Sequence, residues 1–180
     1  FTLRYLTFLL LISIELTSCQ PKAKISVIEN PMTGFTPMLA DSIRGAATVQ
    51  ELGNYLFLSL KGEITYYQLE KFFPDSANIA MIYELTQTGV KDANLAAIAD
   101  TAQSQLLHGW TKTQREVSML GENWTDATFT KLLIQELENQ TLPGKKITIE
   151  CKSGKQTLRA SAKCLKIGDR WFIGEEIKFG

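Results

Sequence analysis

Apolar residues recur at the three- and four-residue spacing of amphipathic helices in the chain that follows residue 48. Thr48 and Glu51 form a capping box, in which the hydroxyl and the carboxylate each satisfy a backbone N–H of the first helical turn. Thr65 and Gln68 repeat this arrangement, and Gly62 between them is suited to end the first helix. The expected apolar positions are Val49, Leu52, Leu56 and Leu60 in the first helix, and Tyr66, Leu69, Phe72 and Phe73 in the second.

Two further helices are predicted before residue 121. Pro74 interrupts the second helix, and Asp75 can cap a third, which ends near Gly89. Asp92 can open a longer fourth helix. Their apolar positions are Ile79, Ile82 and Leu85, and then Leu95, Ile98, Ala99, Ala102, Leu106, Trp110, Val117 and Leu120.

The hydrophobic period changes to two after Gly121. Three segments, 146–152, 156–165 and 170–178, alternate apolar and polar residues as half-buried strands do. Residues 127–133 fit either a strand or a helix that continues through Leu137, and we favour the strand because three clear strands follow it. The order along the chain, with helices first and a four-stranded antiparallel meander last, predicts an α+β fold.

The turn between the last two strands sets their register. Gly168 and Asp169 form a two-residue loop with glycine first, which is compatible with a type II′ turn. This loop places Cys164 opposite Ile173 and turns Trp171 toward the core. The expected core-facing row is Ile147, Ile149, Cys151, Leu158, Ala160, Ala162, Cys164, Ile173 and Trp171.

Two cysteines fall at the alternate positions of these strands that carry the apolar side chains. If Ser153 and Gly154 form a two-residue loop, Cys151 lies opposite Gln156, and Cys164 follows eight residues later on the same strand. That separation is on the order of 25 Å at about 3.3 Å per residue. A disulfide requires Cα atoms within about 7 Å. We therefore interpret both residues as small buried hydrophobes, and not as a bridge, a metal site or a nucleophile.

The N-terminal end has the order of an export signal. Arg4 precedes an apolar run over 5–14, which is too short for the roughly 20 residues of a membrane span. The following run, Leu16-Thr17-Ser18-Cys19, resembles the lipobox of bacterial lipoproteins, where signal peptidase II cuts before the cysteine and its thiol carries a diacylglycerol. The resemblance implies a signal peptide over 1–18 and a lipidated Cys19 that holds the protein at a membrane outside the cytoplasm. The alternative is an ordinary buried N-terminal helix.

The resemblance also implies a place in the cell envelope and a division of the chain. By analogy, Gln20 after the cysteine, where an Asp would favour the inner membrane, favours the outer membrane. Residues 19–45 contain scattered Pro and Gly without sustained periodicity and are expected to be a tether, with a short extended piece at 25–28. Residues 46–180 are expected to form a single α+β domain.

Three turn-bearing segments of the C-terminal half have a familiar order: 122–127, 151–155 and 163–174. They resemble small exported proteins and lipoproteins that are common in Bacteroidota. The C-terminal sheet of those proteins is similar to cystatin-like or nuclear-transport-factor-like folds. The resemblance therefore implies a cystatin-like domain and an exported location, and it implies no particular activity.

Composition and charge exclude several partners and chemistries. The chain has 19 basic and 19 acidic residues, and no basic face suggests nucleic acid. His108, the only histidine, falls on the polar face of the fourth predicted helix, and with two separated cysteines it cannot form a zinc site. Glu175 and Glu176 are adjacent on a strand and so point to opposite faces, away from a common substrate. We expect no cofactor, no metal and no catalytic motif.

Aromatic residues leave two functional hypotheses open. Folds of this class often form a cone between sheet and helices that can hold a ligand, whereas the same rings can simply fill the core. We expect a non-catalytic binding or interaction domain whose protein or small-molecule partner is unknown. The alternative is a small enzyme, of hydrolase or isomerase type, with a site of Tyr, Asp and Glu side chains in the cone beside Trp171. The aromatic residues are Tyr55, Phe57, Tyr66, Tyr67, Phe72, Phe73, Trp110, Trp124 and Trp171.

Overall fold

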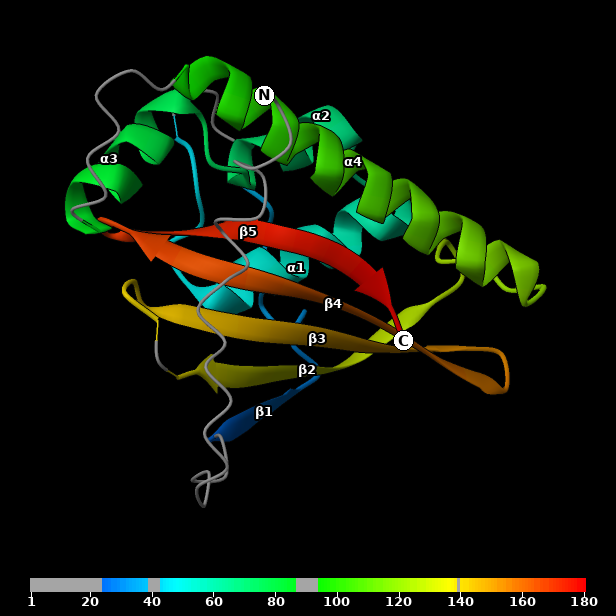
Figure 1. Ribbon diagram of the computed structural model, residues 1–180. Helices are drawn as coiled ribbons and strands as arrows, with labels where there is room; N and C mark the ends of the chain where they lie inside the picture. Colours follow the sequence, from blue (N-terminus) through cyan, green and yellow to red (C-terminus); the bar gives the residue numbers. More distant parts are fainter. Residues whose placement is uncertain (1–23, 39–42, 87–93, 139) are drawn as a thin grey trace, which may run out of the picture.

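The fold is α+β, as predicted, with helices preceding most of one antiparallel sheet (Figure 1). The computed structural model describes residues 24–38, 43–86, 94–138 and 140–180. The helices are α1 (Val49–Lys61), α2 (Tyr66–Leu69), the 3-10 turn η1 (Glu70–Phe72), α3 (Ser76–Thr86) and α4 (Leu95–Met119). The strands are β1 (Ile25–Glu29), β2 (Thr128–Leu137), β3 (Gly144–Ser153), β4 (Gln156–Ile167) and β5 (Arg170–Phe179).

The sheet built by the described residues has five strands in the order β1-β2-β3-β4-β5, and not the four that were predicted. The added strand, β1, pairs with β2 and lies within the stretch 19–45, which was expected to be a tether. The segment 127–133 fitted a strand or a helix, and from Thr128 onward it belongs to strand β2. Its pairing with β3 explains why this segment is a strand and not a helix, because Leu132 lies opposite Ile149 and both side chains are buried.

The loop between β3 and β4 differs by one residue from the prediction. Ser153 pairs with Gln156, so Gly154 and Lys155 form the loop, and Gly154 has a φ of 55°. A positive φ at the first loop position favours glycine, which explains the placement. Cys151 therefore lies opposite Leu158, and not opposite Gln156.

The β4–β5 turn follows the prediction. Ile167 pairs with Arg170 across Gly168 and Asp169, and Gly168 has a φ of 60°. Cys164 lies opposite Ile173 as expected. All nine residues of the expected core-facing row are buried.

Helix α1 packs on the core face of the sheet, and α4 runs along β5 (Figure 1). Gly53 lets α1 approach β2, because a Cβ there would lie 2.8 Å from a methyl carbon of Leu132. Gly109 does the same for α4, where a Cβ would lie 2.6 Å from the carbonyl oxygen of Ile177. Backbone of the preceding segment also closes on β5, since Ala46 and Trp171 exchange two N–H···O bonds of 2.9 Å.

The helix caps are mostly those predicted. Thr48 accepts the N–H of Glu51, but the Glu51 carboxylate accepts the N–H of Ala47 and not that of Thr48. Thr65 and Gln68 form the full capping box. The predicted opening of α4 at Asp92 lies outside the described residues, and Asn94 caps that helix.

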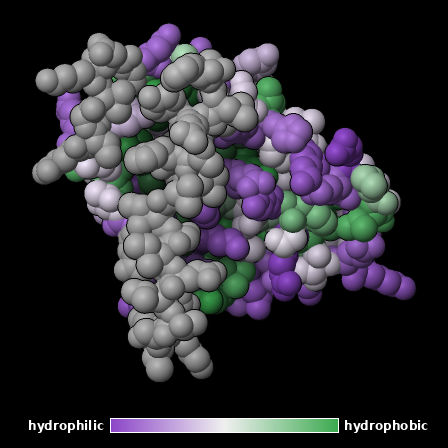
Figure 2. All heavy atoms as spheres, viewed as in Figure 1, coloured by the Kyte–Doolittle hydropathy of each residue, from purple (hydrophilic) through white to green (hydrophobic). Residues whose placement is uncertain are grey.

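The surface is mixed in character. In Figure 2 the described part of the visible face is largely hydrophilic, with hydrophobic side chains gathered at the C-terminal end of α4. Met119 and Leu120 are exposed at that end. None of the described helices is both long and apolar enough to cross a bilayer.

Candidate functional site

Aromatic rings occupy the space where a ligand-holding cone was considered. The Tyr55 ring stacks on Phe72 with centroids 4.4 Å apart, and the Phe57 ring lies 4.8 Å from Phe129. Tyr66 contacts Trp110 at 5.6 Å, and the Trp110 indole N–H donates to the Ser59 hydroxyl. In the described part of the chain these rings fill the core instead of lining a cone.

Polar groups in that interior are few. The described residues with buried polar side chains are Asn54, Ser59, Thr113, Ser153 and Ser161. None of the five is an acid, a base or a thiol.

Two depressions lie beside the N-terminus of α1, with volumes of about 250 and 170 Å³. Glu51 borders both, so we treat them as one groove and call it the α1 groove. Its first part is lined by Thr33, Gly34, Phe35, Thr48, Gln50, Glu51 and Asn54. Its second part is lined by Met38, Ile43, Gly45, Glu51, Lys71, Phe72 and Arg170.

The loop after β1 forms one wall of the α1 groove. Asn30 adopts a φ of 47°, and its carbonyl accepts the N–H of Thr33 to close the turn. The carbonyl of Pro31 then accepts the side-chain amides of Asn54, at 3.1 Å, and Gln50, at 3.3 Å. These two bonds hold the loop against the first turns of α1.

Asn54 leaves an acceptor unused at the base of the α1 groove. The residue is 1% exposed, and its Oδ1 has no hydrogen-bond partner among the described residues. A buried polar atom without a partner costs about 1–3 kcal/mol. The Glu51 carboxylate also lines the groove, and one of its oxygens accepts the N–H of Ala47.

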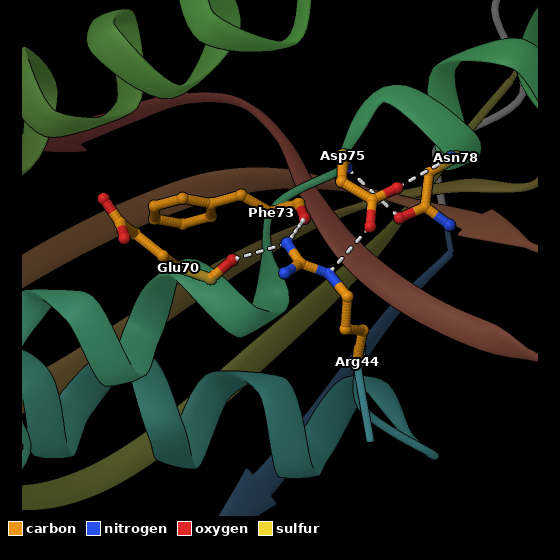
Figure 3. Close-up of polar contacts among 5 residues, drawn as sticks. All are labelled: Arg44, Glu70, Phe73, Asp75 and Asn78. Atoms are coloured by element: carbon orange, nitrogen blue, oxygen red, sulfur yellow. Dashed lines mark hydrogen bonds and ion pairs between the residues drawn. The ribbon is translucent and has the colours of Figure 1, made fainter. Parts of the chain in front are cut away.

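The second part of the α1 groove is held by a clamp at Arg44 (Figure 3). The guanidinium donates to the backbone carbonyls of Glu70, at 3.2 Å, and Phe73, at 3.1 Å, and it pairs with the Asp75 carboxylate at 3.1 Å. Asp75 in turn accepts the backbone N–H of Asn78 and caps α3. Each member of this cluster is already engaged in holding residues 43–46 on η1 and α3, so we interpret the cluster as structural.

Burial shifts the pKa values of groups around the α1 groove. The pKa of Tyr55 is raised by burial, although its hydroxyl exchanges hydrogen bonds with the backbone of Met38. The pKa of Glu70 is also raised by burial, and the nearby Arg44 opposes that shift. Tyr55 lies outside the lining of the groove, and its hydroxyl serves to hold the backbone of Met38, which does line it.

The residues singled out in the sequence are dispersed in the structure. Cys151 and Cys164 are free and buried, as predicted, and burial raises the pKa of Cys151 to about 12. His108 is exposed on α4. Glu175 pairs with Lys163 and Glu176 pairs with Lys178, each as a solvated ion pair. The lipidation residue Cys19 and the signal peptide lie outside the described residues.

Metal ligands do not gather in the described chain, where no group of three or more His, Cys, Asp or Glu side chains could hold an ion. No family model, no curated protein and no solved structure matches the sequence.

Proposed function

We propose that the protein is a non-catalytic interaction domain, tethered through a lipidated Cys19 to the outer membrane of a bacterial cell envelope. The lipobox-like run before Cys19 supports the tether. The observation that carries the interaction role is the α1 groove, whose lining includes the exposed Thr33 and Thr48 and the half-buried Glu51. The cystatin-like assignment of the fold is part of the same proposal, supported by a helix packed on an antiparallel meander.

The tether is tested by labelling bacteria that express the chain with a palmitate analogue. We expect Cys19→Ser to lose the label and to move from the membrane fraction to the soluble fraction, since stable anchoring needs two or more acyl chains. Cys151→Ala is the matched control, because Cys151 is a buried thiol outside the lipobox-like run and should leave the label in place. Unchanged membrane retention of Cys19→Ser would refute the tether.

The interaction role is tested by site-specific photocrosslinking in intact envelopes. A benzoyl-phenylalanine at Thr33, an exposed residue on the rim of the α1 groove, should give a discrete crosslinked species. The same group at His108, which is exposed on α4, is the control and should give none. Equal crosslinking at the two positions, or none at either, would count against the groove as a binding surface.

A further inference from the structure

We propose that the open edge of β1 binds an extended peptide segment of a partner protein as a sixth, antiparallel strand, and that this segment carries a basic residue opposite Glu29. The inference goes beyond the proposed interaction role, because it names a second surface and the chemistry of a partner for that surface. The surface is separate from the α1 groove.

The two edges of the sheet are treated differently by the fold. At β5, Ala46 pairs with Trp171, and Gly109 brings α4 against the backbone of Ile177. At β1, no strand of the described chain lies on the outer side. Proteins usually cover or blunt a sheet edge because unpaired N–H and C=O groups invite another strand. Only one of the two edges has such cover in the described chain.

The backbone bonds to β2 show which groups of β1 face outward. The carbonyl of Lys24 accepts the N–H of Glu136, and the N–H of Asn30 donates to Thr130. Backbone groups of successive residues alternate between the two sides of an antiparallel strand. The even-numbered residues therefore bond to β2, and Ile25, Val27 and Glu29 direct their N–H and C=O groups to the open edge.

The same three residues display side chains on the face of the sheet away from α1. Ile25 is 56% exposed and Val27 is 51% exposed, which is unusual for two apolar residues so close together. A strand added beside them would place apolar side chains opposite both. Such β-strand addition takes affinity from backbone bonds and specificity from alternate side chains.

Charges on this face of the sheet indicate which kind of residue a partner strand places opposite Glu29. Glu29 lies opposite Lys131, Lys131 opposite Glu150, and Glu150 opposite Arg159 on four successive strands. Ion pairs of 3.4 Å for Glu29–Lys131 and 2.8 Å for Glu150–Arg159 follow from this register. The row alternates in sign and ends at the open edge with an acid that is 61% exposed. A basic residue on an incoming strand continues the alternation.

This row argues against a second copy of the chain as the occupant. In a two-fold pairing of β1 with β1, the outward-facing residues of one strand lie opposite those of the other, and these are Ile25, Val27 and Glu29. No basic residue then meets Glu29. A segment with the order basic, apolar, apolar at alternate positions fits the antiparallel edge better.

The probe is the labelled peptide Ser-Lys-Thr-Val-Thr-Val-Ser, titrated by fluorescence anisotropy into the full chain carrying Cys19→Ser. Its antiparallel register sets Lys opposite Glu29 and the two Val opposite Val27 and Ile25. We expect saturable binding that weakens about tenfold when the peptide Lys becomes Glu, because the oppositely charged pair with Glu29 then becomes a like-charged pair. Glu29→Lys should reverse this preference.

Proline separates edge binding from folding. Val27→Pro removes an N–H that faces the open edge, so it should abolish binding while circular dichroism and thermal midpoint stay near wild type. Ile28→Pro removes an N–H that faces β2 and should instead lower the midpoint. If Val27→Pro fails to fold, the charge reversal at Glu29 carries the test by itself.

Several results would overturn the inference. These are unchanged peptide binding by Val27→Pro, absence of the charge reversal, no saturable binding, and a concentration-dependent dimer that Val27→Pro disrupts, which would assign the edge to a second copy. Because the assay is done in solution on an edge distinct from the α1 groove, its failure leaves the tether and crosslinking results untouched, and their failure leaves the peptide result standing.

Discussion

Glu70 shows how burial and charge oppose each other on a single side chain. Burial raises the pKa of its carboxyl, and Arg44 pulls the pKa back only in part, because the guanidinium bonds to the backbone carbonyl of Glu70 and pairs with Asp75. The ionised form of Glu70 is therefore less favourable in the fold than in the unfolded chain. The negative charge of Glu70 therefore lowers the stability of the fold at neutral pH.

Glu70→Gln is accordingly expected to stabilise the protein at pH 7. With a folded pKa above the unfolded one, the folded state binds more protons, so the Glu70 contribution falls as pH rises through the two values. The advantage of Glu70→Gln should be largest above both pKa values and should vanish below both. Urea unfolding midpoints of the two proteins between pH 3 and pH 8, roughly the range that spans a carboxyl titration, check this. A constant difference across that range would contradict it.

At the scale of elements, Gly109 governs how closely α4 lies on β5. A Cβ at this position meets the Ile177 carbonyl oxygen at 2.6 Å and its amide nitrogen at 3.1 Å, and backbone cannot rotate away as a flexible side chain can. Ile177 lies where the register of β5 against β4 shifts, between the pairs Ser161–Lys178 and Lys163–Glu175. The glycine is therefore a packing requirement and not a flexible point.

Gly109→Ala should destabilise the fold by about 1–3 kcal/mol, the usual cost of overpacking, even though alanine is the better helix former. Chemical denaturation measures the difference. Ser104→Ala, at an exposed position of α4, is the matched control and should be neutral or slightly stabilising. A stabilising Gly109→Ala would mean that α4 and β5 are further apart than described.

The sequence could predict elements whose signal is local. Strand β3 alternates buried and more exposed residues along most of its length, and the glycine-first turn at Gly168 predicted the pairing of Cys164 with Ile173. The extended piece predicted at 25–28 is confirmed as β1, but its place in the sheet was missed because its partner β2 is remote in sequence. The β3–β4 loop was misplaced by one residue because Ser153-Gly154 and Gly154-Lys155 fit equally well by composition.

The α1 groove was missed for a related reason. Its far wall is the loop that follows β1, and that loop was assigned to a tether. One signal was present, since Asn54 is a polar residue inside a helix whose stretch from Leu52 to Leu60 is buried throughout. A lone amide in such a helix indicates a specific partner, and the partner here is the Pro31 carbonyl.

At the scale of the whole molecule, Trp171 joins three parts of the fold. It lies at the start of β5, bonds through its backbone to Ala46, and holds the Lys145 ammonium of β3 at 5.3 Å from its ring centroid. Its neighbour Phe172 is also buried, although it points to the other face, because Gly45 packs on its ring. The segment 43–46 is thus part of the domain.

Trp171→Ala is expected to cost about 3–5 kcal/mol, a large share of the roughly 5–15 kcal/mol that stabilises a domain. Arg170→Ala, at the half-buried preceding position, should change stability by less than about 0.5 kcal/mol. Thermal and urea unfolding of both variants make the comparison. Near-equal losses would indicate that the strand register is slipped by one residue.

The pairing of β1 with β2 has a consequence for the order in which the chain is made. Val27 and Leu133 lie opposite each other but are about a hundred residues apart in sequence, and such non-local pairing forms slowly. During synthesis β1 leaves the ribosome long before β2 is made. Ala46 is separated from its partner Trp171 by an even longer stretch of chain. The completed sheet therefore depends on the C-terminal third of the chain. That delay suits the export we propose, because the chain lacks its complete sheet until synthesis is nearly finished.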